Sequence, residues 1–600
     1  MTEPERETKP RPAPPRPPAW RGLIRLWALL AFYVAAAAYS TWPLAATPGS
    51  RVAFDTGDPS LTAWIFGWAA HAIVHQPLRL FSANMFSPEP LALAYSENML
   101  GLSLPMAPVV WLTGNAVLAE NLAILTWLAI GGLGTYLLVR RLTRCPPAAF
   151  AAGLAYAIAP YRLSQLGHPH VVGAALAPFL VLLLLGLGEP ADARRRRHQM
   201  LGAGAVLGAQ FWVSLNGGIF ALAAAAAWGL WEFLRHRRAA RPALVRGAGA
   251  VAIGIALSLP VLVPYAILRQ QHPRYYHPSE EIRQFSATPG SYLTPFADGP
   301  VVDPLTTPLF NRFQGQGWWE KTLFPGFVLS VAGVAAFALV LTRRGRPGDG
   351  LAAAVGLGAA VAAVAVVLSF GPTWGGRADG FPLPFALVEL LFSGVARVPA
   401  RFGVLVPLGL AICLGAVITA AGPARRRPLA AVAVALLLVE LAPQTVDTYP
   451  LPARTAAHAA VAGRPGAVLA LPTGELDADG VITGESIARE ALHMYLSTAH
   501  FRPMVNGYGA YQTDEWFEMV AAVADLPSAT AFADLARRDV RTLIVQTDLV
   551  KGTRWAQVEG RLRAWPGVRE LARGTGVVVY DITDAGAAAR ASTAMASRSS

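Results

Sequence analysis

Residues 351–370 read LAAAVGLGAAVAAVAVVLSF, a stretch of 20 residues without a charged side chain. An α-helix of about 20 apolar residues is long enough to cross the roughly 30 Å hydrocarbon core of a bilayer. Arginines precede this stretch at Arg343–Arg346, and a polar loop follows it from residue 371. The stretch therefore predicts a membrane-spanning helix.

Further apolar runs extend this pattern in both directions along the chain. They lie at 23–44, 118–139, 147–163, 171–188, 200–214, 217–234, 244–268, 323–342, 402–421 and 429–446. Together they predict a mainly α, polytopic membrane protein of about 11 spans. For the first run a cleavable signal peptide is the alternative, although its length favours a retained anchor. Leu100–Leu112 is too short to span and contains Pro105 and Pro108, so we expect a re-entrant or interfacial segment there.

The charged residues indicate the orientation. Only 14% of residues are charged, against roughly 25% in soluble domains, and the net charge is +13. Of the 50 basic residues, 24 lie in short clusters, which are the N-terminal segment through Arg25, Arg140–Arg144, Arg194–Arg197, Arg235–Arg246, Arg343–Arg346 and Arg425–Arg427. Eleven spans place every cluster on the cytoplasmic side. We therefore expect a multi-pass protein of the inner membrane with a cytoplasmic N-terminus and no nucleic-acid partner.

Four parts follow from this topology. We expect a disordered cytoplasmic tail at 1–20, a transmembrane domain at 21–446, an extracytoplasmic α/β domain at 447–584 and a disordered tail at 585–600. Within the α/β domain, short apolar runs predict strands, and longer amphipathic stretches predict helices. The strands are expected at Ala467–Leu471, Thr542–Gln546 and Gly576–Ile582, and the helices at Ser486–Thr498 and Ser528–Arg538.

The first outer loop contains two carboxylates three residues apart, Asp55 and Asp58. Asp58 precedes Pro59, which is typical of a helix N-cap, so a capping role is the alternative for it. Asp55 precedes a flexible Thr-Gly step and is free to point into a cavity. The following stretch, Leu61–Val74, is expected to be an amphipathic helix at the membrane interface. Glu97 lies further along the same loop, where capping is again the alternative.

Three other outer loops carry candidate groups. His168 and His170 flank a proline and suit a metal or a substrate, although two histidines alone are not a zinc motif. Glu320 follows Trp318-Trp319, and aromatic side chains at a membrane edge form an interfacial belt or stack on sugars. Arg397 and Arg401 lie outside, against the positive-inside trend, and a guanidinium fork matches a phosphate. Snorkelling to lipid head groups is the alternative for these arginines.

The first-loop acids, the many spans and the C-terminal α/β domain together resemble the bacterial GT-C glycosyltransferase superfamily, in particular its YfhO-like and RgtA/B/C/D-like membrane proteins. The segments that carry the resemblance are Phe86–Gly101, Arg397–Phe402, Tyr495–Thr498 and Val505–Gly509. The resemblance implies an inverting hexosyl- or pentosyltransferase. Its donor would be a polyprenyl-phosphate sugar and its acceptor an envelope lipid, glycan or protein, on the extracytoplasmic side.

The resemblance also implies roles for single residues. Asp55 matches the first-loop acidic position, which serves as general base or metal ligand, and Asp58 stands beside it as a second catalytic candidate. Arg397 and Arg401 would hold the lipid phosphate, and the helix after Asp58 would guide the polyprenyl chain. The substrate-binding candidates are Glu97, His168, His170, Glu320, Arg397 and Arg401. No extended acidic motif follows in the second outer loop, so no cofactor is certain and Mg²⁺ or Mn²⁺ stays open.

Two other functions compete with catalysis. The number of spans also fits a transporter or lipid flippase, but ion and proton pathways usually need charges in mid-span. Such charges are scarce here, and Glu440 in the last run is the main exception. A non-catalytic accessory subunit of envelope glycan assembly, whose C-terminal domain binds a glycan or an enzyme, is the other alternative.

Overall fold

The computed structural model describes residues 19–273, 279–296, 303–315, 317–342, 350–392, 396–442, 446–475 and 483–589. Most of the expected N-terminal tail and the cluster Arg343–Arg346 lie outside these residues. The expected C-terminal tail lies only partly outside them. Residues 583–589 are helical, and Ala585 and Ala589 are buried, so the segment predicted to be disordered begins in ordered structure.

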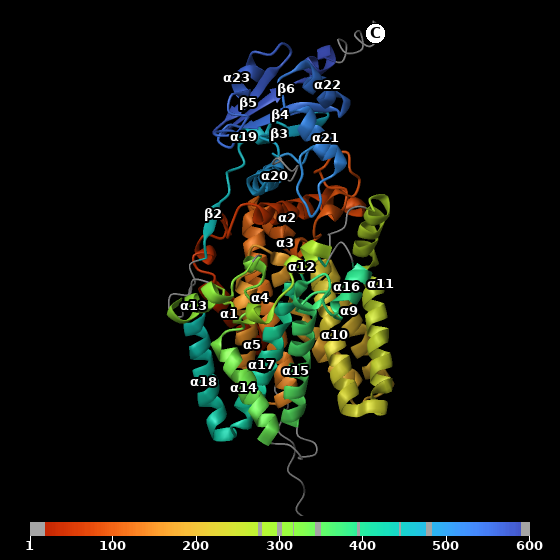
Figure 1. Ribbon diagram of the computed structural model, residues 1–600, viewed down its shortest axis with the longest axis vertical. Coiled ribbons are helices and arrows are strands. Elements are labelled where there is room, and N and C mark those ends of the chain that lie inside the picture. Colours follow the sequence, from red (N-terminus) through yellow and green to blue (C-terminus); the bar gives the residue numbers. More distant parts are fainter. Residues whose placement is uncertain are drawn as a thin grey trace, which may run out of the picture.

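A bundle of long helices forms the body of the protein (Figure 1). Each predicted run overlaps one main helix, although the runs 147–163 and 171–188 are broken into shorter helices. The main helices are α1 (Ala19–Ser40), α4 (Ala116–Thr143), α5 (Pro146–Ala157), α8 (Ala177–Leu187), α9 (Ala193–Val213), α10 (Leu215–His236), α11 (Arg241–Gln271), α14 (Phe327–Thr342), α15 (Gly350–Ser369), α17 (Val406–Ala420) and α18 (Pro423–Glu440). The uncharged stretch 351–370 is α15. The helices run side by side along the long axis of the molecule.

Six helical segments among the described residues are long and apolar enough to cross a membrane. They are Gly22–Ser40, Ala116–Thr143, Pro169–Leu187, Leu215–Gln271, Gly350–Ser369 and Pro399–Ala420. Leu100–Thr113 and Phe327–Thr342 are apolar but shorter. The chain is thus a polytopic α-helical membrane protein, and the number of eleven spans stays a prediction.

Two arginine clusters share one end of the bundle. Arg235–Arg246 extend from the end of α10 to the start of α11, and Arg425–Arg427 lie in the first turns of α18, directly after the connection from α17. The turns α10–α11 and α17–α18 lie at the end remote from the C-terminal domain (Figure 1). This end is the one that we expect to face the cytoplasm.

Prolines interrupt the helical run that leads to the two histidines. After α5, Pro160 begins the short helix α6 (Pro160–Leu163), and Pro169 begins α7 (Pro169–Val172). A proline disfavours the helical conformation in the preceding residue, so each proline starts a new helix. The intervening loop, residues 164–168, brings His168 into the protein.

The helix after Asp58 is not an amphipathic surface helix. It is α2 (Asp58–His75), and 13 of its 18 residues are buried. It packs between α3 (Leu100–Thr113) and α20 (Gly484–Ser497) of the C-terminal domain. A helix that is buried on most of its sides is not amphipathic, and α2 is such a helix. The expected amphipathic character of Leu61–Val74 is therefore wrong, and its position at the membrane interface stays a prediction.

The C-terminal domain contains a four-stranded sheet in the order β3-β4-β6-β5. Its strands are β3 (Ala467–Leu471), β4 (Val540–Gln546), β5 (Arg569–Gly574) and β6 (Val577–Asp581). β3 and β4 are parallel, and β6 is antiparallel to both β4 and β5. Only β5 has no counterpart in the sequence prediction, because it is an exposed edge strand that carries charges instead of an apolar run.

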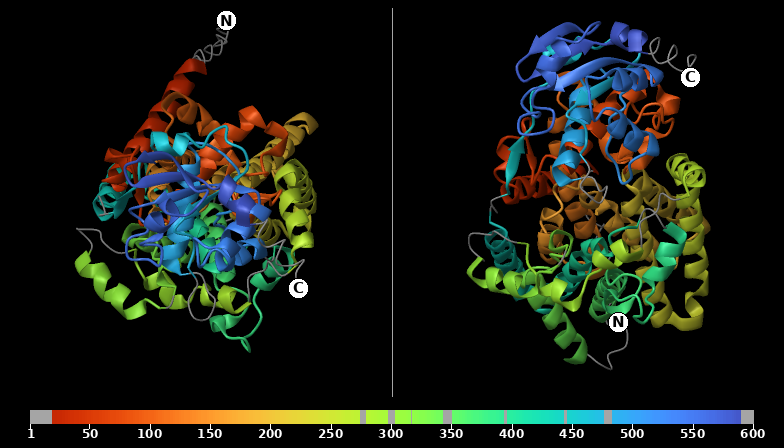
Figure 2. Two further views of the ribbon diagram at one scale, coloured as in Figure 1. Left: turned by 90° about the horizontal axis from the view of Figure 1, so that it is seen from above. Right: turned by 45° about the horizontal axis from the view of Figure 1, so that its top comes forward.

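Helices surround this sheet, and the domain covers the centre of the bundle when seen along the long axis (Figure 2). They are α19 (Ala456–Ala459), α20, α21 (Asp514–Ala522), α22 (Ala529–Arg537) and α23 (Val558–Arg563). The stretches expected to be helical at Ser486–Thr498 and Ser528–Arg538 correspond to α20 and α22. The remaining helices are α12 (Ser279–Gln284), α13 (Asp303–Phe313) and α16 (Phe385–Phe392) in the outer loops.

A two-stranded sheet joins the first outer loop to the start of the C-terminal domain. Strand β1 (Arg51–Ala53) pairs antiparallel with β2 (Thr448–Pro450). The Arg51 Nε donates to Thr448 Oγ1 at 2.8 Å, which adds a side-chain bond to the pairing. Both carboxylates of the first loop follow β1 directly, so this pairing sets their place relative to the C-terminal domain.

Candidate functional site

A cavity of about 380 Å³ lies where the bundle meets the C-terminal domain. Its walls come from α2 and the first outer loop, the histidine loop, α10, α11, the end of α16, the segment before α17, and residues 508–511. Six of the eight predicted site residues line the cavity, namely Asp58, Glu97, His168, His170, Arg397 and Arg401. Asp55 and Glu320 do not line it.

Asp58 presents its carboxylate to the cavity and caps nothing. The N-cap of α2 is Gly57, and no side chain caps this helix. One oxygen, Oδ2, accepts from His168 Nε2 at 3.0 Å, and Oδ1 accepts from the Tyr508 hydroxyl at 2.8 Å. Burial alone would raise the pKa of Asp58, but the hydrogen bond and charge of His168, the hydrogen bond from Tyr508 and the charge of Arg397 outweigh burial and hold that pKa well below its ordinary value. The carboxylate is therefore ionised at neutral pH.

Asp55 forms a turn instead. It is exposed, and its Oδ1 accepts from the backbone N–H of Gly57 at 2.6 Å, the geometry of an Asx turn. Desolvation raises the pKa of Asp55 above its ordinary value, and repulsion from Asp58 adds to the shift. Asp55 thus supports the chain before α2 while Asp58 lines the cavity, and the catalytic role of each carboxylate stays a prediction.

The two histidines of the loop have different partners. His168 joins Asp58 through Nε2 and Gln165 Oε1 through Nδ1, the latter at 3.0 Å. His170 accepts at Nε2 from Arg401 Nη1 at 3.0 Å, since a guanidinium can only donate. Their rings lie edge to face with centroids 5.6 Å apart. His168 therefore bonds to the acid Asp58, whereas His170 bonds to the base Arg401.

Both outward arginines meet acids, which accounts for their position. Arg401 and Glu320 form a two-point ion pair with side chains only 8% and 4% exposed, and Arg401 Nε reaches Glu320 Oε2 at 3.1 Å. Burial would raise the pKa of Glu320, but the Arg401 charge holds it below its ordinary value. Arg397 is 37% exposed at its side chain and touches Glu281 at 3.4 Å. Arg397 is therefore more accessible to a phosphate than Arg401, and the exposed Arg269 lines the same cavity.

Glu97 caps a helix far from it in sequence. Its Oε2 accepts from Leu215 N at 2.8 Å, and its Oε1 accepts from Asn216 N at 3.1 Å and from the Asn216 side chain at 2.6 Å. These groups form the start of α10, where a carboxylate is favoured. Burial nevertheless raises the pKa of Glu97. Glu97 thus fixes the first loop to the bundle and places its own backbone at the cavity wall.

Glu440, the acid expected in mid-span, lies at the last residue of α18. Its Oε2 accepts from Val328 N at 3.1 Å, and its Oε1 accepts from Phe327 N at the start of α14. Its oxygens are therefore taken up by a helix N-terminus.

The described residues do not bring three His, Cys, Asp or Glu side chains together in any metal-binding group. At the cavity, Asp58 and His168 are the nearest approach to such a set, and they already bond to each other. The donor set does not fit a resident Mg²⁺ or Mn²⁺, and no step of the chemistry is assigned to one.

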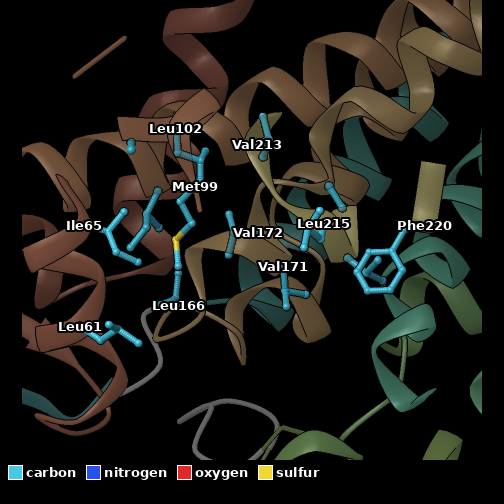
Figure 3. Close-up of a cluster of buried hydrophobic side chains, with 14 of the residues drawn as sticks. Leu61, Ile65, Met99, Leu102, Leu166, Val171, Val172, Val213, Leu215 and Phe220 are labelled. Carbon is cyan, nitrogen blue, oxygen red and sulfur yellow. The ribbon is translucent and has the colours of Figure 1, made fainter. Parts of the chain in front are cut away.

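Apolar packing surrounds these polar groups. Figure 3 shows side chains from α2, α3, the histidine loop, α7, α9 and α10 gathered in one cluster. Among them are Leu61, Leu102, Leu166, Val171 and Leu215, all buried. Because buried side chains interdigitate closely, the cluster holds the backbone beneath Asp58 and the histidines.

Tyr508 belongs to the site and was not among the predicted residues. Its position in Val505-Asn506-Gly507-Tyr508-Gly509 was noted only as part of a family-like segment. The sequence Gly507-Tyr508-Gly509 could have indicated a site residue, because glycines on both sides of a tyrosine permit a close approach of the backbone to a neighbouring surface. Tyr265, Arg269 and Tyr511 also line the cavity and carried no comparable signal.

The chain is similar in structure to AglB and ArnT. AglB is an archaeal oligosaccharyltransferase from Archaeoglobus fulgidus, solved with an inhibitory peptide and a dolichol-phosphate. It is 12% identical, has a TM-score of 0.38, and the match covers 94% of this chain and 74% of AglB. ArnT from Cupriavidus metallidurans, solved with undecaprenyl phosphate, is 15% identical with a TM-score of 0.38, and the match covers 94% of this chain and 98% of ArnT. No family model matches the chain, and no curated protein matches it in sequence. At these TM-scores the function has to be argued from the site.

Proposed function

We propose that the protein is a membrane glycosyltransferase that moves a sugar from a polyprenyl-phosphate carrier to an envelope lipid, glycan or protein. The observation that carries this proposal is that an accessible carboxylate, Asp58, and two accessible guanidinium groups, Arg397 and Arg269, line the same cavity. Glycosyl transfer from a phosphate needs a base at the acceptor and a cation at the leaving group.

The reaction assigns a role to each group. The acceptor hydroxyl oxygen attacks the anomeric carbon of the donor, and the bond from that carbon to the phosphate oxygen breaks. The electron pair of this bond leaves with the phosphate, where the Arg397 fork stabilises the added negative charge. The hydroxyl proton passes to a carboxylate oxygen of Asp58, which keeps free lone pairs beside its two hydrogen bonds. Direct displacement inverts the anomeric centre.

The apolar wall of the cavity suits a lipid carrier. Leu262 and Ala266 of α11 and Leu391 of α16 line the cavity. Neighbouring residues on these helices point outward, with Val263 45% and Leu390 75% exposed. Exposed apolar surface on a membrane protein suits contact with lipid, so these residues can accommodate an isoprenoid chain beside the cavity.

This proposal includes a location. Residues 508–511 of the C-terminal domain line the cavity, and this domain lies at the end of the bundle remote from the turns α10–α11 and α17–α18. Together with the positive-inside rule, this supports transfer on the extracytoplasmic side of the inner membrane, with the N-terminus in the cytoplasm. Whether the transferred unit is a hexose or a pentose follows from the mass that the test below measures.

The test uses a strain that lacks the protein and is complemented with wild type, Asp58→Asn or Asp55→Asn at matched membrane levels. Envelope glycans and glycolipids are compared by mass spectrometry. We expect a defined sugar-mass deficit that wild type and Asp55→Asn restore and that Asp58→Asn does not. Full restoration by Asp58→Asn, or identical glycans in all strains, would contradict the proposal.

A further inference from the structure

Residues 504–510 of the C-terminal domain lie directly on the first outer loop. The backbone N–H of Phe86 donates to Asn506 O at 2.9 Å, and that of Ser87 donates to Met504 O at 2.9 Å. At the other end of the segment, Ala510 N donates to Tyr95 O at 2.7 Å. Main-chain bonds at both ends hold the segment in one place relative to the loop that carries Asp58.

The glycines on both sides of Tyr508 make this contact close. A Cβ at Gly507 would lie 2.4 Å from the Phe86 ring, and a Cβ at Gly509 would lie 2.4 Å from Tyr95 O. No side chain fits at either position without a shift of the segment, and one of the two obstacles is backbone. The segment therefore reaches the first loop only because residues 507 and 509 have no side chain.

A buried acid fixes the segment from the other side. Glu490 of α20 is 0% exposed, and its Oε2 accepts from Gly507 N at 3.1 Å. Its Oε1 accepts from Gly474 N at 2.7 Å, next to the end of β3. Tyr508 thus follows a residue that is anchored to both the helix and the sheet of its own domain.

As a result, the hydroxyl of Tyr508 in the C-terminal domain donates a hydrogen bond to the carboxylate of Asp58 in the transmembrane domain. Tyr508 holds Asp58 Oδ1 while His168 holds Oδ2, so the carboxylate is bound at both oxygens from opposite directions. Two such bonds prevent rotation of the carboxylate about its Cβ–Cγ bond. Reaction rates depend steeply on such orientation, because a 1 Å misplacement can cost about 10²-fold.

We propose that Tyr508 is a positioning residue for Asp58 and that the C-terminal domain therefore completes the site of transfer. The inference rests on the proposed function and goes beyond it, since it assigns a part in the reaction to the extracytoplasmic domain. It predicts that the transmembrane domain alone holds Asp58 at only one oxygen.

The experiment compares Tyr508→Phe with Tyr580→Phe in the full-length protein. Both changes delete one hydroxyl from a tyrosine of the C-terminal domain, but Tyr580 lies on β6 and does not line the cavity. Transfer is followed as the rate at which pulse-labelled sugar enters the glycan that the deletion strain lacks, per unit of membrane protein. We expect about a tenfold or larger fall for Tyr508→Phe and the wild-type rate for Tyr580→Phe.

A double-mutant cycle separates positioning from simple packing. Unfolding temperatures in detergent are measured for wild type, Tyr508→Phe, Asp58→Ala and the double variant. We expect the shift caused by Tyr508→Phe to vanish in the Asp58→Ala background, because the hydroxyl acts on that carboxylate. An equal shift in both backgrounds, or a wild-type transfer rate for Tyr508→Phe while Asp58→Asn abolishes transfer, would overturn the inference and leave the proposed function intact. Transfer by Asp58→Asn would overturn the proposed function itself.

Discussion

The acidic and the basic wall of the cavity are built in different ways. On the acidic wall, the carboxylate of Asp58 is 36% exposed at its side chain, although it accepts from His168 Nε2 at 3.0 Å and from the Tyr508 hydroxyl at 2.8 Å. On the basic wall, the pair of Arg401 with Glu320 is almost fully buried, and the more exposed Arg397 has a longer contact to Glu281 at 3.4 Å. The difference shows that pairing closes off a charged group on the basic wall, whereas Asp58 on the acidic wall is paired and still reachable by a substrate.

We expect the largest effect on stability from breaking the buried ion pair between Arg401 and Glu320. Glu320→Gln leaves the Arg401 charge in place without its counter-charge, and breaking a buried pair costs about 3–5 kcal/mol. We expect a large fall in unfolding temperature and in the amount of folded protein in membranes, measured by thermal unfolding in detergent and by blotting.

The control for this change is Asp379→Asn, which removes an acid from the exposed pair Arg377–Asp379 and should leave the unfolding temperature unchanged. Glu320 also links stability to pH. Because its folded-state pKa is depressed, the pair stabilises the protein above the ordinary glutamate pKa of 4.5, and this contribution is lost as the pH falls through the folded pKa. An unchanged unfolding temperature for Glu320→Gln would contradict the description of the pair as structural.

The accessible cation provides the next largest effect. Arg397→Ala removes the guanidinium expected at the leaving phosphate, and we expect transfer to fall about 10²-fold, as for other groups that stabilise developing charge. Arg397→Lys should recover only part of the rate, because an ammonium lacks the planar fork. The measurement is the rate of label incorporation at matched protein levels. If the lysine and alanine variants transfer at the wild-type rate, the phosphate lies elsewhere.

The smallest effect is expected at the other carboxylate of the first loop. Asp55→Asn keeps an oxygen that can accept from Gly57 N, so the turn before α2 survives and transfer should stay within about twofold of wild type. Asp55→Ala removes that acceptor and should lower the unfolding temperature without abolishing transfer. Loss of transfer in Asp55→Asn with normal folding would return the catalytic role to Asp55 and reverse the comparison of the two carboxylates.

The helices were predictable because their signal is local. Long apolar runs separated by arginine clusters require helices in a membrane, and each predicted run overlaps a helix, although prolines break the runs 147–163 and 171–188 into shorter pieces. The prediction failed for α2, which is not amphipathic but largely buried, in contact with α3 and with α20 of the C-terminal domain. Composition shows that a helix must be buried, but it does not show what buries it.

The arrangement at the first loop was not predictable from local pattern. Asp58 is separated by 110 residues from His168 and by 450 residues from Tyr508, and these two partners decide its orientation. From the motif alone, Asp58 fits an N-cap and Asp55 fits a free carboxylate, but in the fold Gly57 is the N-cap of α2. The residue types and their loops were nevertheless enough to find most residues of the cavity, since six of the eight predicted site residues line it.

A reconstituted system tests most directly whether Asp58 takes part in sugar transfer from a lipid phosphate. Lipid extracts of the deletion strain, which should contain the unused carrier, are reconstituted into proteoliposomes with purified wild type or Asp58→Asn, and the lipids are followed by mass spectrometry. We expect wild type to convert the polyprenyl-phosphate sugar to polyprenyl phosphate while an acceptor gains one sugar mass, and we expect Asp58→Asn to do neither. Movement of the intact carrier across the bilayer without loss of its sugar, equal for both proteins, would show instead that the protein is a lipid flippase.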